Sequence, residues 1–164
     1  MAITYTPIDT QTLGSAAASV TFSSISGSYT DLVLVTNASN VSTDSNLNLQ
    51  FNSDTASNYS STRLSGDGST ATSATTANLV YIVAGRANAT GSIAANSIVN
   101  IMNYSNTTTY KTVLTRANNA ASIVGAYVGM WRNTAAITSI LIYSNNAANI
   151  SAGSTFTLYG IKAA

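Results

Sequence analysis

Apolar and polar residues alternate along most of this chain, which is the period of a β-strand with one buried face. In residues 46–52, for example, leucine and phenylalanine alternate with asparagine and glutamine. Residues 31–36 and 78–84 are apolar at both parities, so we expect them in central or interface positions. Alternation or a short apolar run predicts further strands at residues 3–5, 20–22, 59–64, 97–104, 110–116, 122–132, 136–143 and 155–161.

Glycine, asparagine and serine separate these segments, as turn residues do. No segment of helical length shows a convincing 3.6-residue period. Eight to ten short strands divided by such turns are typical of a β-sandwich or barrel. We therefore predict one all-β domain over residues 19–164, an antiparallel β-sandwich.

Two segments depart from the alternating pattern. Residues 1–18 contain the one proline, Pro7, and a tail of small residues. We predict that they form an N-terminal arm that becomes ordered only against a neighbouring subunit, with a flexible terminus as the alternative. Residues 53–77 are mostly Ser, Thr, Ala, Gly and Asp, and we predict exposed turns around one strand near Tyr59.

The amino-acid composition excludes several classes of catalytic and metal-binding site. Charged residues form 7% of the chain, against about 25% in an average soluble protein, and His and Cys are absent. Without them there is no Ser-His-Asp or Cys-His catalysis and no thiolate or imidazole zinc site. Five dispersed aspartates supply all the acidic side chains, so we predict no enzymatic activity and no cofactor. Asp54 and Asp67 flank the long loop and are the candidates for binding a cation such as calcium.

The composition and net charge also bear on the partners and the location of the protein. Ser, Thr and Asn supply 66 of the 164 residues, and the net charge is +1. No basic patch marks a nucleic-acid surface, and no apolar run approaches the ~20 residues of a membrane span. The first residues lack the basic and apolar regions of a secretory signal, so we expect synthesis and assembly in the cytoplasm.

The single tryptophan, Trp131, allows two interpretations. It follows Gly125 and Gly129, which share its face of a predicted strand, and glycines there often mark a close approach of another chain. Trp131 either caps the core, or stacks on a sugar or packs into a neighbouring subunit. Both interpretations stay open at the level of sequence.

Several short motifs, taken in order, resemble small structural proteins of tailed bacteriophage virions. The segment FNSDT at residues 51–55 is followed by NY at 58–59, and GMWR at 129–132 precedes AITSI at 136–140. The chain ends with GSTFTLYGI at 153–161. The resemblance covers about residues 19–162, although Ser53 stands where that family usually has glycine.

The resemblance implies a jelly-roll-like sandwich in a phage particle. We expect a capsid decoration (cement) protein that contacts the major capsid or tail protein. The alternatives are a tail or fibre protein that binds a host glycan, and a non-viral carbohydrate-binding module.

The apolar run at 78–84 adds an expectation of self-association, since one of its faces needs cover, either from other strands of the chain or from a second copy. A trimer is favoured because the resemblance points to virion sites with three-fold symmetry. The interface or ligand candidates are Tyr5, Pro7, Ile8, Leu79, Val80, Tyr81, Ile82, Val83 and Trp131.

Overall fold

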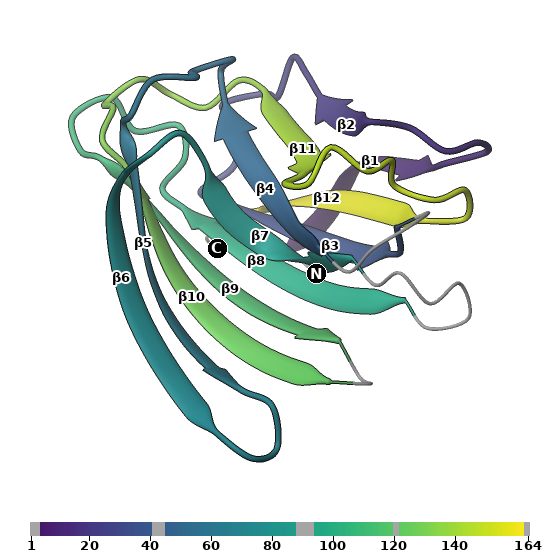
Figure 1. Ribbon diagram of the computed structural model, residues 1–164. Helices are drawn as coiled ribbons and strands as arrows, with labels where there is room; N and C mark the ends of the chain where they lie inside the picture. Colours follow the sequence, from purple (N-terminus) through teal and green to yellow (C-terminus); the bar gives the residue numbers. More distant parts are fainter. Residues whose placement is uncertain (1–3, 41–44, 88–93, 120–121, 163–164) are drawn as a thin grey trace.

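The computed structural model describes residues 4–40, 45–87, 94–119 and 122–162, and it forms an all-β sandwich of two antiparallel sheets (Figure 1). The large sheet has the order β1-β12-β3-β8-β9-β10-β5-β6, and the small sheet has the order β2-β11-β4-β7. The prediction of an all-β sandwich is confirmed. The strands are β1 (Tyr5–Thr12), β2 (Ser19–Phe22), β3 (Asp31–Ala38), β4 (Ser45–Phe51), β5 (Tyr59–Gly66), β6 (Ala71–Leu79), β7 (Ile82–Ala87), β8 (Ala95–Met102), β9 (Lys111–Asn119), β10 (Ile123–Trp131), β11 (Ile140–Ser144) and β12 (Thr155–Ile161).

The described ranges contain no helix, and so none that could cross a membrane. Strands that the sequence pattern predicts are present at β2, β3, β4, β5, β8, β9, β10, β11 and β12, with boundaries shifted by a few residues. The pattern identifies these strands because each has one face against the core.

The core lies between the two sheets. The alternating apolar side chains of β4, Leu47, Leu49 and Phe51, are fully buried, and each contributes about 1.5–3 kcal/mol by leaving water. The polar face of β4 is covered as well, contrary to the expectation of a half-exposed strand. Gln50 is buried, and its amide donates a hydrogen bond to the carbonyl of Val80 at 2.9 Å.

Residues 53–77 form more regular structure than the sequence predicts. β5 and β6 make a hairpin in which cross-strand hydroxyls meet, Thr62 with Thr75 at 3.1 Å and Ser65 with Thr72 at 3.0 Å. β6 is an edge strand and is exposed at every position up to Leu79. Since β6 buries neither face, its sequence carries no apolar alternation, and the pattern missed it.

The N-terminal segment is ordered by its own chain. β1 pairs with β12 from Tyr5 opposite Ile161 to Thr12 opposite Thr155. A bulge between Pro7 and Asp9 accommodates the proline. Proline has no N–H to donate to the strand ladder, so it is found mainly in edge strands and at bulges, and β1 is an edge strand. Of the interface candidates here, Ile8 packs on the chain's own core, while Tyr5 is exposed. Order in this segment therefore does not require a neighbouring subunit.

The apolar run at 78–84 is a corner and not one strand. Leu79 ends β6 in the large sheet, and Ile82 begins β7 in the small sheet. Ile82 is fully buried and Leu79 packs on the core, while Tyr81 and Val83 are half-buried. Only Val80, 37% exposed, reaches solvent to a large extent. The two apolar parities arise because the chain crosses between sheets, so this run gives no support for a trimer.

Candidate functional site

The described aspartates lie apart: Asp9 is inside β1, where it accepts a hydrogen bond from the Gln11 amide, and the others serve separate turns and strand ends. Asp31 accepts a hydrogen bond from the backbone N–H of Asn103. Asp67 accepts the backbone N–H groups of Ser69 and Thr70 at 2.9 and 2.7 Å, and these bonds lower the pKa of its carboxyl. Within the described ranges no three His, Cys, Asp or Glu side chains gather around a point. Asp44 lies outside the described residues.

The two candidate cation ligands lie apart. Asp54 precedes β5 and Asp67 follows it, so the strand's eight residues separate them by about 25 Å. Each carboxylate accepts hydrogen bonds within its own loop, and that of Asp54 accepts one from Trp131 of β10 as well. The structure therefore does not combine Asp54 and Asp67 into one site.

Asp54 organises the FNSDT loop around the core. Its Oδ2 accepts the indole N–H of Trp131 at 2.7 Å and the Asn58 amide at 2.9 Å, and its Oδ1 accepts the backbone N–H of Ala56 at 2.9 Å. Burial acts to raise the pKa of this carboxyl, but the hydrogen bonds from Asn58, Trp131 and Ala56 outweigh it and hold the pKa below 3.8. The Tyr59 hydroxyl donates to the backbone carbonyl of Asp54 at 3.0 Å.

Trp131 belongs to the core. It is 1% exposed, and its ring stacks on that of Tyr59 with the ring centroids 6.3 Å apart. The centroid of the Phe51 ring lies 5.6 Å from that of Trp131. A ring in this position is unavailable to a sugar or a neighbouring subunit. Gly129 on the same face permits a close approach within the chain, because a Cβ there would lie 2.4 Å from Ile82 Cγ2 of β7.

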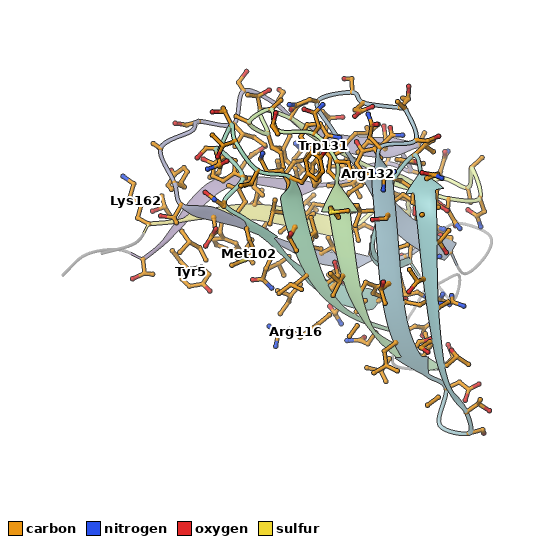
Figure 2. All side chains as sticks on the ribbon, turned by 90° about the vertical axis from the view of Figure 1, so that its left-hand side faces the viewer. Tyr5, Met102, Arg116, Trp131, Arg132 and Lys162 are labelled. Carbon is orange, nitrogen blue, oxygen red and sulfur yellow. The ribbon has the colours of Figure 1, made fainter. Side chains whose placement is uncertain are left out.

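The surface that stands out is the outer face of the large sheet, the face turned away from the small sheet. Figure 2 shows Tyr5, Met102 and Arg116 on this side, with Trp131 on the opposite side. By strand register this face carries eight of the ten large apolar side chains found exposed in the described ranges, with exposed fractions from 38% to 64%. They are Tyr5, Val35, Leu64, Ile98, Met102, Leu114, Val124 and Val128.

The centre of this outer face is hollowed. Two adjoining hollows of about 570 and 550 Å³ share Leu64, Arg116 and Ala126 in their linings. These residues stand side by side in the ladder, Leu64 opposite Ala126 and Ala126 opposite Arg116, with Ile98 next to Arg116 on β8. Arg116 is exposed, and among the described residues no hydrogen bond or ion pair reaches its guanidinium.

The chain matches no protein-family model, and no curated protein matches its sequence significantly.

Sequence reasoning missed most of the outer face, apart from Tyr5 and the run at 31–36, which contains Val35. One signal was present: β8 has apolar residues at both parities, with Ile98 and Met102 facing outward and Val99 and Ile101 facing the core. A soluble domain rarely exposes a contiguous apolar patch above about 300–600 Å² without a use for it. Seven of the eight side chains, all except Tyr5, lie on the neighbouring strands β3, β8, β9, β10 and β5.

Proposed function

We propose that this chain is a non-enzymatic structural component of a bacteriophage virion, best described as a capsid decoration protein. The resemblance of the ordered motifs at residues 51–59, 129–140 and 153–161 supports the virion assignment. The motif residues Asp54, Tyr59 and Trp131 bond one another and form a structural support, which suits a framework protein.

The observation that carries the assembly role is the outer face of the large sheet. Its exposed residues are aliphatic around the hollows, and packing of aliphatic side chains is the chemistry of protein–protein contact. Few charges oppose such contact, since the whole chain has six basic and five acidic residues. This face is therefore the surface through which we expect the protein to attach to the particle.

Glycan binding by a tail or fibre protein is the second candidate. The observation in its favour is the exposed β5–β6 hairpin, whose hydroxyls and amides could bond a sugar. Sugar binding also uses an aromatic platform in most sites, and Trp131 is not available for that role.

Imaging of the particle tests the proposal. Purified particles carrying a peptide tag at the chain terminus are labelled with gold-conjugated antibody and viewed by electron microscopy. Label over the head surface supports decoration, and label at the tail tip supports the glycan-binding alternative. Particles that infect normally but contain none of the chain by mass spectrometry would refute the virion assignment. Binding of the purified protein to a glycan array, lost on Ser61→Ala or Thr75→Ala, would favour the second candidate.

A further inference from the structure

The outer face contains one cation without a counter-ion at its centre. Among the side chains that β3, β5, β8, β9 and β10 direct to this face, the charged ones are Arg116 and Asp31. Asp31 lies two strands and four residues away in register, about 15 Å from Arg116 by strand geometry. It is also bonded to the Asn103 backbone N–H. Arg116 is thus surrounded by Ile98, Leu114 and Ala126.

We propose that the hollow around Arg116 binds a segment of a partner protein that presents one carboxylate between aliphatic side chains. The proposal rests on the proposed function, and it adds the chemistry of the partner. A guanidinium binds a carboxylate through two parallel N–H···O bonds, and apolar neighbours that exclude water strengthen the pair. The aliphatic side chains of the partner fill the two hollows beside Arg116.

The same geometry disfavours a second copy of this chain as the occupant. A two-fold contact would place a hollow against a hollow, and two concave surfaces leave unfilled space between them. It would also bring Arg116 toward Arg116 of the other copy, and like charges in such a contact are costly. A projecting segment with an acidic side chain meets neither obstacle.

The first experiment measures binding to the particle. Particles that lack this chain are mixed with purified wild-type protein or a variant, and the bound fraction is measured by co-sedimentation. Arg116→Glu places an anion in the hollow and should raise the half-saturating concentration about 30-fold or more. Lys162→Glu is the matched control, because it makes the same reversal of charge at an exposed residue that follows β12 and lines neither hollow.

The control should bind within about threefold of wild type. Val124→Asp, an exposed change at the rim of the first hollow, should weaken binding as Arg116→Glu does, whereas Arg116→Lys should retain part of it. If Arg116→Glu and Val124→Asp both bind the particle as tightly as the wild-type protein does, the proposal is overturned. Because all these positions are exposed, the single-tryptophan fluorescence should confirm that each variant is folded.

The second experiment is independent of the particle. The peptide Ac-Val-Leu-Asp-Leu-Val-NH₂ is titrated into methyl-labelled protein and binding is followed by NMR. The control is the same peptide with asparagine in place of the aspartate, called the Asn peptide. We expect shifts at the methyl groups of Leu64, Leu114, Val124 and Val128, and at least tenfold weaker binding of the Asn peptide. Equal binding of the two peptides would refute the role of the carboxylate.

Two results separate the proposals. Absence of the chain from particles would refute the proposed function, while a carboxylate-dependent peptide signal would still support the hollow as a binding site. Light scattering that shows a wild-type oligomer, dissociated by Arg116→Glu, would assign the face to a second copy and overturn the partner proposed here.

Discussion

Replacing Asp54 by alanine should destabilise the whole sandwich, although Asp54 is only half-buried in a loop. Its carboxylate is the acceptor for the indole N–H of Trp131 at 2.7 Å, and Trp131 is 1% exposed. Without this acceptor the indole N–H is left unpaired inside the core. The Asn58 amide and the Ala56 N–H lose the same carboxylate, but both can turn to water.

The magnitude follows from these three contacts. An unpaired buried donor costs about 1–3 kcal/mol, and each hydrogen bond lost near solvent costs about 0.5–1.5 kcal/mol. The sum predicts that Asp54→Ala lowers the free energy of unfolding by about 2–6 kcal/mol. Since small domains are stable by about 5–15 kcal/mol, this loss is a large part of the total.

Urea unfolding followed by fluorescence provides the assay, because Trp131 is the single tryptophan and reports directly on this contact. Asp67→Ala is the matched control. That aspartate also accepts two backbone N–H groups, but it is fully exposed and supports no buried donor, so its removal should change the midpoint little. If Asp54→Ala unfolds within 1 M urea of wild type at an unchanged m-value, the indole bond is not the support described here.

The same carboxylate predicts an acid-sensitive stability. The folded pKa of Asp54 is lowered below 3.8, so its contribution is present above that pH and is lost as pH falls through the folded pKa. Asp54→Asn should flatten the decline of stability as pH falls below the ordinary pKa of an aspartate. If the free energy of unfolding declines identically with falling pH in the wild-type protein and in Asp54→Asn, the assignment to Asp54 is wrong.

Three further changes test other parts of the fold. Gly129→Ala should cost about 1–3 kcal/mol in urea unfolding, because its Cβ would collide with Ile82, whereas Gly14→Ala, with no atom nearby, should be neutral. Burial raises the pKa of Tyr59 to about 12, so stability should fall as pH rises from about 10 to 12, and Tyr59→Phe should remove part of that fall in alkaline titrations. Deleting residues 1–12 removes β1 and the packing of Ile8, and should lower the melting temperature; an unchanged melting temperature would restore the idea of an independent arm.

The sequence predicts the sandwich well where a strand has one buried face. β12 alternates cleanly between buried and half-buried positions as predicted, whereas β4 is a strand as predicted but is covered on both faces. β6 shows the limit of this signal, because a strand that buries neither face has no apolar side chain to place in register. Its strand structure comes from pairing with β5, a contact made only after the chain has turned at Asp67.

Tertiary structure also decides between interpretations that the sequence leaves open. Leu79 lies in the large sheet and Ile82 in the small sheet. Interpreted as one strand, the apolar run that contains them has an uncovered face, but in the structure the chain itself covers most of it. Trp131 is assigned to the core by Asp54, which is 77 residues earlier in the chain. Neither fact has a local signature, since both depend on which segments lie side by side.

The outer face of the large sheet meets no second sheet. The small sheet packs on the other face, so the apolar residues that point outward are not part of the core between the sheets. In β9, Leu114 and Arg116 share the outer parity, while Val113 and Thr115 face inward. Alternation alone cannot assign which parity meets the small sheet, because each contains an apolar residue. Once the register is known, the outward aliphatic residues gather around one unpaired guanidinium, and this combination is the basis on which we propose the face as a binding surface.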